Sequence, residues 1–352
     1  MRWLLAALLL VSASRTLRAE TIVYVSVADE RKIAAYRMAD DGKLTRLAAT
    51  KVPGQAAALT TDPARKFLFA SLREEGKIAS FRIDPKTGAL TAVSVIPAGA
   101  DPAQLSTDRK GRYLLTAYYV AAKVTVHEIG PNGELTEKPT QEIATAEKAH
   151  AIMADAKNRF VFVPHTGPNA VFQFRFDAET GRLTPAKPAK VETKKDTGPR
   201  HLVFHPTKEI AYVVNEQGGS VTSYSFGGGR LKPIQTLSTL PDDFRGTNAC
   251  AEIRIHPTGK FLYAANRGHE SIAMFALDGA GKLASLGQEP TEKNPRSFDI
   301  DPSGKFLYAA GESSGKLACY RIDAKTGKLS RFATLEVGKT PWWVMAVEMP
   351  GK

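Results

Sequence analysis

The sequence predicts an all-β fold, and within that class a seven-bladed β-propeller, on three observations. A short phrase, Gly-x-Leu, recurs seven times at intervals of 45 to 52 residues. The segments between the phrases alternate apolar and polar residues and are broken by Gly, Pro, Asn and Asp, as strands are. No segment keeps a helical period. Repeats of this length are typical of four-stranded propeller blades. The leucines of the phrase are Leu44, Leu90, Leu135, Leu183, Leu231, Leu283 and Leu329.

Each repeat is interpreted as four short strands. Before the second strand stands a turn that begins with an acidic residue or a histidine and leads into an aromatic strand, as in Asp62-Pro63 and His256-Pro257. His205 and His256 are therefore interpreted as turn residues. In the fourth complete repeat the expected strands cover residues 202–204, 210–214, 221–226 and 231–237.

The two ends of the chain predict how the ring closes. Residues 22–27 correspond to the second strand of a blade, and the missing first strand is found at residues 341–347. We expect this C-terminal strand to join the N-terminal blade, so that residues 20–352 form one domain. A closed ring buries the faces of every blade and leaves only short, protected edges.

Residues 1–19 are predicted to be a secretory signal peptide. Arg2 precedes an apolar run over residues 4–11, which is far shorter than the roughly 20 residues that span a bilayer. The alternative is a buried N-terminal strand. Cleavage after Ala19 would remove three arginines and no acidic residue, so the formal charge would fall from +12 to +9. We expect a soluble, exported protein, periplasmic or extracellular, with no membrane span.

Comparing equivalent positions in the seven repeats indicates where a site lies, because a purely structural position should carry similar residues in every blade. The first strand of each blade begins at the rim of the central channel, and the residue five places before the turn should be equivalent in all blades. Three of these rim residues are alanine and four are bulky, which a purely structural position would not explain. They are Ala57, Ala103, His150, Arg200, Ala251, Arg296 and Trp342.

The second strands end at the same rim and bring further polar residues to it. Asn215-Glu216 and Asn266-Arg267 occupy this position in two successive blades. One carboxylate among arginines stays ionised and can activate a water, while forked guanidinium donors suit a carboxylate, a phosphate or a developing oxyanion. The alternative is a structural ring of ion pairs between blades.

Other signals are interpreted as structural. Cys250 and Cys319 are interpreted as buried small residues, because two cysteines cannot build a disulfide scaffold or a four-Cys zinc site. No Walker or dinucleotide-binding motif occurs, and we expect no metal and no cofactor. Many lysines lie in scattered turns, with no basic helix or basic-aromatic strip, which argues against a nucleic-acid partner.

The phrases Pro199-Arg200-His201 and Asn215-Glu216 resemble the signature of the seven-bladed propeller lactonases of the 6-phosphogluconolactonase type. Segments 249–253, 266–268, 295–298 and 341–344 are similar to that family in the same register. The resemblance covers nearly the whole chain after residue 19. It implies a site in which His150, Arg200, Glu216 and Arg267 surround the channel mouth. Two positions depart from the family pattern: Lys148 replaces a frequent histidine, and Glu312 replaces a frequent amide beside Arg296.

We therefore expect a metal-independent lactonase that acts as a monomer on a small lactone or an anionic sugar acid. Glu216 is predicted to activate water, with Arg200 and His150 polarising the lactone carbonyl. The predicted substrate-binding residues are Arg267, Arg296, Asn215, His201 and Trp342. Two alternatives stay open. One is a non-catalytic scaffold that binds a protein or glycan, which a salt bridge between Glu216 and its arginines would favour. The other is a lactonising cycloisomerase of the muconate type, which occurs in the same family.

Overall fold

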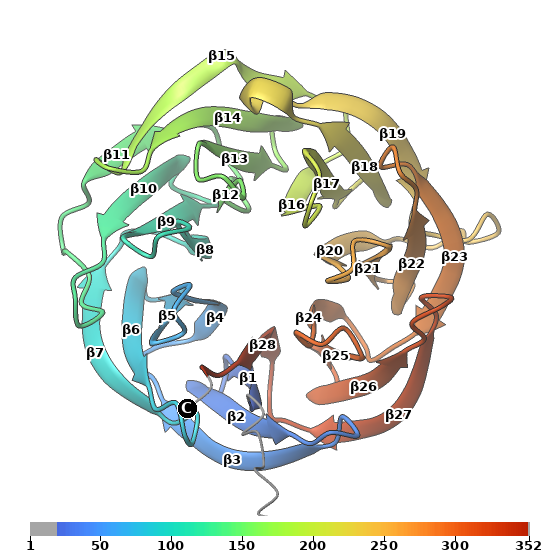
Figure 1. Ribbon diagram of the computed structural model, residues 1–352, viewed down its shortest axis with the longest axis horizontal. Coiled ribbons are helices and arrows are strands. Elements are labelled where there is room, and N and C mark those ends of the chain that lie inside the picture. Colours follow the sequence, from blue (N-terminus) through green and yellow to red (C-terminus); the bar gives the residue numbers. More distant parts are fainter. Residues whose placement is uncertain (1–19, 351–352) are drawn as a thin grey trace, which may run out of the picture.

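The computed structural model describes residues 20–350, which form a closed ring of seven four-stranded antiparallel sheets around a central channel (Figure 1). Blade 1 contains β28 (Pro341–Glu348), β1 (Thr21–Val27), β2 (Lys32–Met38) and β3 (Leu44–Lys51). Blade 2 contains β4 (Ala56–Thr61), β5 (Phe67–Leu72), β6 (Lys77–Ile83) and β7 (Leu90–Pro97). Blade 3 contains β8 (Pro102–Thr107), β9 (Tyr113–Tyr118), β10 (Lys123–Glu128) and β11 (Gln141–Ala144).

The other four blades repeat this order. Blade 4 contains β12 (Met153–Ala154), β13 (Phe160–His165), β14 (Ala170–Asp177) and β15 (Arg182–Glu192). Blade 5 contains β16 (Pro199–Phe204), β17 (Ile210–Asn215), β18 (Ser220–Ser225) and β19 (Lys232–Ser238). Blade 6 contains β20 (Ala249–Ile255), β21 (Phe261–Arg267), β22 (Ser271–Leu277) and β23 (Leu283–Pro290). Blade 7 contains β24 (Pro295–Ile300), β25 (Phe306–Gly311), β26 (Lys316–Ile322) and β27 (Leu329–Glu336).

The predicted fold and ring closure are confirmed. β28 pairs antiparallel with β1, with Tyr24 opposite Met345, so the C-terminal strand completes the N-terminal blade. The only helical element of residues 20–350 is a 3₁₀ turn, η1 (Gly227–Gly229), between β18 and β19, and no helix in this range is long and apolar enough to cross a membrane. The predicted signal peptide, residues 1–19, lies outside the described residues.

The glycine of the repeated phrase joins each blade to its neighbour. At Gly42 the backbone is left-handed, with φ of 85°, and a Cβ atom there would overlap the ring of Phe306. The hydroxyl of Tyr308 in blade 7 donates to the Gly42 carbonyl in blade 1, at 2.8 Å. Glycine is therefore required both for its backbone conformation and for the close approach of the next blade. The equivalent hydrogen bonds join Tyr24 to Gly88 and Tyr263 to Gly327, each at 2.8 Å.

The turns between first and second strands confirm the interpretation of His205 and His256. In the aspartate turns, Asp62 Oδ1 accepts hydrogen bonds from the backbone of Lys66 and Phe67, at 2.7 and 2.6 Å. In the histidine turns, the ring Nδ1 of His205 or His256 accepts a hydrogen bond from the backbone N–H of Thr207 or Thr258, each at 3.2 Å. These histidines organise a hairpin.

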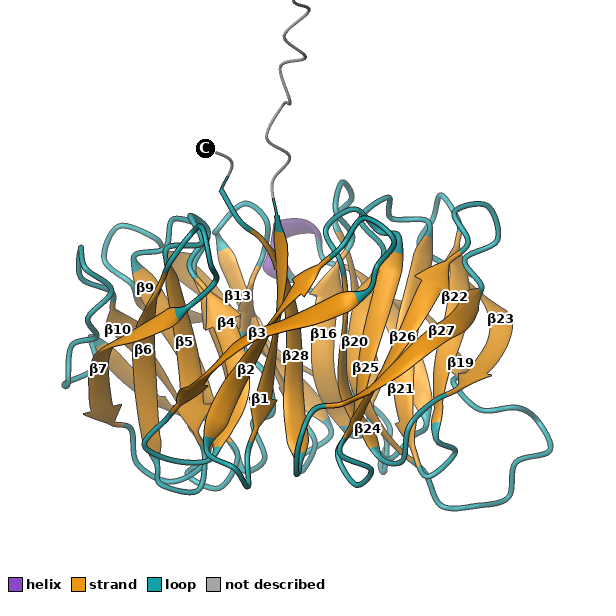
Figure 2. Ribbon diagram, turned by 90° about the horizontal axis from the view of Figure 1, so that it is seen from below, coloured by secondary structure: helices purple, strands orange, loops and turns teal. Residues whose placement is uncertain are grey.

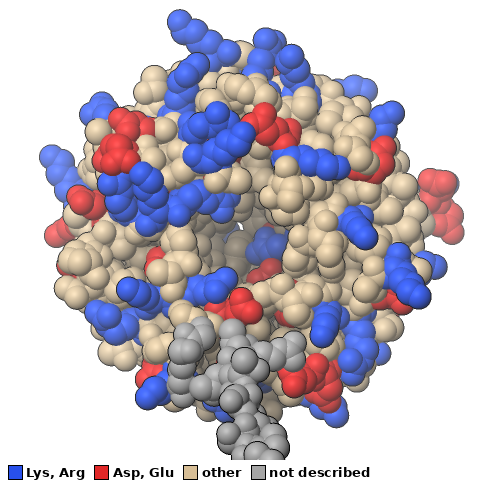
Figure 3. Space-filling model, in the orientation of Figure 1, with Lys and Arg blue, Asp and Glu red and all other residues tan. Residues whose placement is uncertain are grey.

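All first strands begin on the same face of the ring, the lower face in Figure 2, and the channel opening on this face is called the mouth below. The long loop over residues 239–248 projects from this face beside β19. The opposite face carries both ends of the described chain. Figure 3 shows that face, with many Lys and Arg side chains spread over it around a central hollow. The wide spacing of these charges agrees with their position in the repeat turns.

Buried histidines make the fold sensitive to acid. His127 on β10 and His165 on β13 are almost fully buried, and burial lowers the pKa of each to about 4 from 6.5. The unfolded chain therefore binds protons that the folded chain excludes, so stability is full above pH 6.5 and falls as the pH drops toward 4. Between pH 7 and pH 5 we expect a loss of about 2 kcal/mol for each histidine. Urea unfolding at the two pH values measures it.

The control for this expectation is His127→Gln, which removes one titrating group. Its free energy of unfolding should fall less steeply with acid than that of the wild type. Parallel pH curves for the two proteins would contradict the assignment of the acid sensitivity to His127.

Candidate functional site

The first strands are irregular at the rim positions that the repeat comparison selects. The pairing register of β16 with β17 shifts between Pro199 and His201, which leaves Arg200 in a bulge. The register shifts in the same way around Arg296 in β24 and at Trp342 in β28. Beside His150, only an isolated bridge between Ala149 and His165 replaces the ladder. Bulges re-aim side chains, and here they give the rim residues directions that a regular strand would not.

Glu216 lies between two arginines at the mouth. It follows β17 directly, and its backbone N–H donates to the Gly198 carbonyl at 2.6 Å. Its Oε1 accepts a hydrogen bond from Arg267 Nη2 at 2.9 Å, and its Oε2 lies 3.2 Å from Arg200 Nε. Arg267 also donates to the carbonyls of Ala249 and Cys250. The three charged side chains come from blades 5 and 6 and form one ion-paired unit.

Burial and charge set the ionisation of this unit. Burial raises the pKa of Glu216, but the attraction of Arg200 and Arg267 outweighs it, and the pKa lies below its ordinary value of 4.5. Burial, followed by repulsion from Arg267, lowers the pKa of Arg200 to about 9. At neutral pH both groups are charged. Among residues 20–350, Glu216 Oε2 has no well-aligned hydrogen-bond donor, so it keeps acceptor capacity.

Two histidines lie beside the ion-paired unit. The ring centres of His150 and His201 are 5.1 Å apart in a T-shaped arrangement, and Tyr119 meets His150 in the same way at 5.5 Å. Burial, and then the charge of Arg200, lower the pKa of both histidines, that of His201 to about 4. Both rings are neutral at pH 7. His150 Nδ1 is buried and has no hydrogen-bond partner within the described chain.

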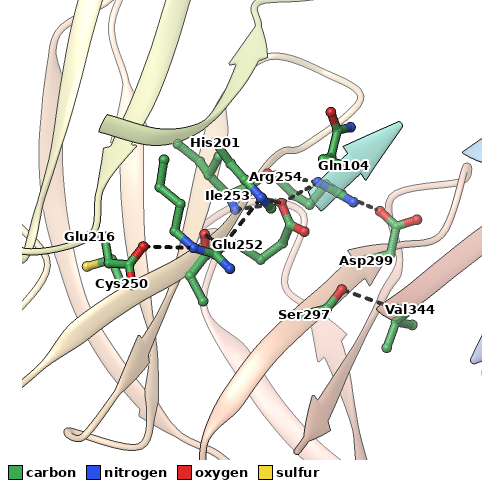
Figure 4. Close-up of polar contacts among 12 residues, drawn as sticks. Gln104, His201, Glu216, Cys250, Glu252, Ile253, Arg254, Ser297, Asp299 and Val344 are labelled. Atoms are coloured by element: carbon green, nitrogen blue, oxygen red, sulfur yellow. Dashed lines mark hydrogen bonds and ion pairs between the residues drawn. The ribbon is translucent and has the colours of Figure 1, made fainter. Parts of the chain in front are cut away.

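His201 also belongs to a buried polar network that the sequence comparison missed (Figure 4). His201 Nδ1 lies 3.1 Å from Glu252 Oε1, which accepts from Arg254 Nη1 at 2.6 Å. Arg254 Nε donates to Asp299 at 2.9 Å. Since Glu252 is ionised, His201 carries its proton on Nδ1 and turns Nε2 toward Arg200 Nη1, at 3.5 Å. The network fixes the tautomer of His201.

The channel below the mouth holds a cavity of about 240 Å³. Its wall combines the polar network with apolar side chains, among them Met153, Trp343 and Met345. His201 belongs to the wall of this cavity and also contacts His150 and Arg200, so it connects the cavity with the mouth.

Arg296 and Trp342 meet on the other side of the mouth. The Arg296 guanidinium lies over the Trp342 ring, 4.5 Å from its centre, and Arg73 approaches the same ring at 5.7 Å. Arg296 Nη1 lies 3.6 Å from Glu312 Oε2, and Arg73 forms a bidentate pair with Asp101. Arg73 and Asp101 were not predicted as site residues. Arg73 stands at a second-strand end, where the comparison of repeats could have found it.

The side chain of Asn215, a predicted substrate-binding residue, is held within its own blade. Its amide donates to Ser220 and Thr222 in the neighbouring strand, at 3.0 and 2.9 Å, and its side chain is fully buried. Among residues 20–350, no hydrogen bond joins it to Glu216. Consecutive residues of a strand point to opposite sides, which separates the Asn215 amide from the carboxylate. Asn215 therefore organises its own hairpin.

The cysteines match their structural interpretation. Cys250 and Cys319 are free and buried, and burial raises the pKa of the Cys250 thiol to about 11 and that of Cys319 to about 12. A thiol with so high a pKa is a poor nucleophile at neutral pH. In the part of the chain that the structure describes, no group of three or more His, Cys, Asp or Glu side chains is arranged to hold a metal ion.

Comparison with known proteins agrees with the predicted resemblance. A model of the family described as "Lactonase, 7-bladed beta-propeller" matches residues 21–346. A protein of Erwinia tasmaniensis named 6-phosphogluconolactonase is 35% identical over 325 residues, which cover 92% of this chain and 98% of the relative. The namesake from Serratia proteamaculans is 36% identical over 326 residues, with coverage of 92% and 98%.

The solved structures agree with these sequence relatives. The structure described as the periplasmic gluconolactonase of Pseudomonas aeruginosa superimposes with a TM-score of 0.85 at 27% identity, covering 94% of this chain and 100% of that one. The family match spans all seven blades and includes the strands that carry the mouth residues. The chain belongs to the seven-bladed β-propeller lactonase family.

Proposed function

We propose that the protein hydrolyses a lactone of a sugar acid at the mouth, without a metal. The observation that carries the proposal is the convergence of Arg200, Glu216 and Arg267 beside the neutral His150. Hydrolysis of a cyclic ester needs an acceptor for the proton of water, donors for the developing oxyanion and a proton for the leaving oxygen. The family membership and the names of the relatives support the same reaction class.

In the proposed mechanism, Glu216 accepts the proton of a water as the water oxygen attacks the carbonyl carbon. Arg200 donates to the carbonyl oxygen as it becomes an oxyanion, and His150 donates a second hydrogen bond from its ring N–H. Collapse of the tetrahedral intermediate breaks the bond to the ring oxygen, which takes up the proton held by Glu216. The products are a carboxylic acid, which ionises, and a hydroxyl group.

The remaining residues position Glu216 or bind the sugar portion in this proposal. Arg267 holds Glu216 in place, and the partly exposed ring of Trp342 offers an aromatic surface beside Arg296 for a polyhydroxy ring. His201 accepts from Arg200 and lies between the mouth and the cavity below it.

A panel of aldonolactones, with acid release followed in a pH-stat, tests the function. The wild type is expected to hydrolyse at least one of them. Arg200→Lys keeps the charge but loses the forked donor, so kcat/KM should fall about 100-fold, mostly through kcat. An inactive wild type on the whole panel would overturn the proposed function.

One observation favours a second candidate, a non-catalytic scaffold that binds an anionic ligand at the mouth. Both oxygens of Glu216 face arginines, and such ion-paired units also serve to stabilise channels. A scaffold predicts ligand binding without turnover, so the lactone panel separates the two candidates directly.

We further propose that the protein is exported and that residues 1–19 are removed. Two observations support this: the apolar run after Arg2, and the structural similarity to the periplasmic gluconolactonase of Pseudomonas aeruginosa. Mass spectrometry of the protein recovered from the periplasm should give a mature chain that begins at Glu20. An intact N-terminus would contradict it.

A further inference from the structure

We propose that the mouth selects a neutral, unphosphorylated lactone, and that Glu312 and Asp101 determine this preference. The proposal rests on the proposed hydrolysis, because it concerns the substrate class of the same site. It differs from the activity that the names of the sequence relatives state, which is toward a phosphorylated lactone.

The arginines at the mouth already have carboxylate partners. Arg200 and Arg267 share Glu216, Arg296 faces Glu312 at 3.6 Å, and Arg73 is held by Asp101. The seven side chains are each at most 20% exposed, so water screens these charges only weakly. Glu312 is also fixed by Asn294 Nδ2, which donates to its Oε2 at 2.9 Å.

The net charge of this group is small. Four guanidinium groups carry four positive charges against three negative ones, and His150 and His201 are neutral at pH 7. The group therefore has a net charge of +1. In the network below, Arg254 is held by both Glu252 and Asp299 and adds no free cation.

A net charge of +1 matches the hydrolysis of a neutral lactone. The substrate and water carry no charge, and the tetrahedral intermediate carries one negative charge on the former carbonyl oxygen when the proton of water rests on Glu216. The site then stabilises charge that develops during the reaction, which lowers the barrier more than it tightens substrate binding.

A phosphate monoester fits this arrangement poorly. It brings about 1.5 to 2 negative charges at pH 7 and three strong acceptor oxygens. Recognition of such a group needs guanidinium forks that are free to donate. At the mouth, a phosphate beside Arg296 or Arg73 would also meet the carboxylate of Glu312 or Asp101. The two acidic residues act against a phosphorylated substrate by repulsion and by occupying the donors.

The test compares δ-gluconolactone with its 6-phosphate for the wild type, Glu312→Gln and Asp101→Asn. The wild type should have the higher kcat/KM for the unphosphorylated lactone. Each variant should shift the ratio of the two kcat/KM values toward the phosphate by about tenfold or more, because one negative charge close to the phosphate is lost. Glu142→Gln makes the same change of charge on the outer strand β11 and should leave the ratio unchanged.

Product binding provides a readout that does not need turnover. Calorimetry of gluconate and 6-phosphogluconate should show the same preference and the same shifts in the variants. A wild type that hydrolyses or binds the phosphorylated compound better overturns this inference while the lactonase function stands. Loss of all hydrolysis, with the binding preference retained, overturns the lactonase function and leaves the charge selection supported.

Discussion

Glu216→Gln is expected to lower kcat for lactone hydrolysis by about 100- to 10,000-fold, the range that removal of a general base produces. The glutamine keeps the size of the side chain but cannot take the proton of water. It also releases the charge that holds Arg200 and Arg267, which are both within 3.2 Å of the carboxylate. Steady-state kinetics with the preferred lactone measures the effect.

The split between kcat and KM distinguishes the two roles of Glu216. If it accepts the proton, kcat falls and KM changes little. If it only holds the arginines, KM rises as well. Because its pKa lies below 4.5, the acid limb of kcat/KM in the wild type should also lie below that pH. Glu142→Gln, on outer strand β11 with an ion pair to Lys123, is the control and should have wild-type rates. Equal rates for Glu216→Gln and the wild type would remove Glu216 from the mechanism.

The second large effect concerns stability. Glu252→Gln should lower the free energy of unfolding by about 3 kcal/mol, the cost of breaking a buried ion pair by removing one partner. Glu252 is fully buried, and it accepts from both His201 and Arg254. Its removal leaves the Arg254 guanidinium with Asp299 alone and frees the ring of His201. Urea unfolding at pH 7 measures the difference.

The pH dependence gives a second check of the Glu252 network. Burial raises the pKa of Glu252, but the charge of Arg254 outweighs this and lowers it from 4.5 to about 2. The stability that Glu252 contributes is therefore present in full above pH 4.5 and is lost as the pH falls toward 2. Glu336→Gln, which removes an exposed ion pair, should change stability by no more than about 0.5 kcal/mol. A similarly small effect of Glu252→Gln would contradict a stabilising role for the network.

The repeat explains why so much of this fold is predictable. Seven copies of one pattern give the strand order, the turns and the ring closure, and unlike residues at one rim position point to His150, Arg200, Arg296 and Trp342. The bulges at that position are not predictable, since they depend on the pairing of each first strand with its second. Only the three-dimensional register gives the side chains their directions.

The deeper network was missed because the comparison stopped at one position. One residue further along the first strands, Glu252 is the only carboxylate, and the equivalent residues are Ala58, Gln104, Ala151, His201, Ser297 and Trp343. Three residues along, Arg254 and Asp299 occupy equivalent places. A search for charged side chains at each step of the strand would have found all three, because most of their equivalents in other blades are uncharged. Their mutual contacts, in contrast, arise only from the ring geometry.

Ring closure by β28 has a practical consequence. The backbone N–H of Met349 donates to the carbonyl of Glu20 at 2.7 Å, so the two ends of the described chain lie together on the face opposite the mouth (Figure 2). An affinity tag, a fusion partner or a solid support attached at either end would leave the mouth facing outward. Immobilised protein should therefore exchange substrate and product with the bulk solution as freely as protein in solution does.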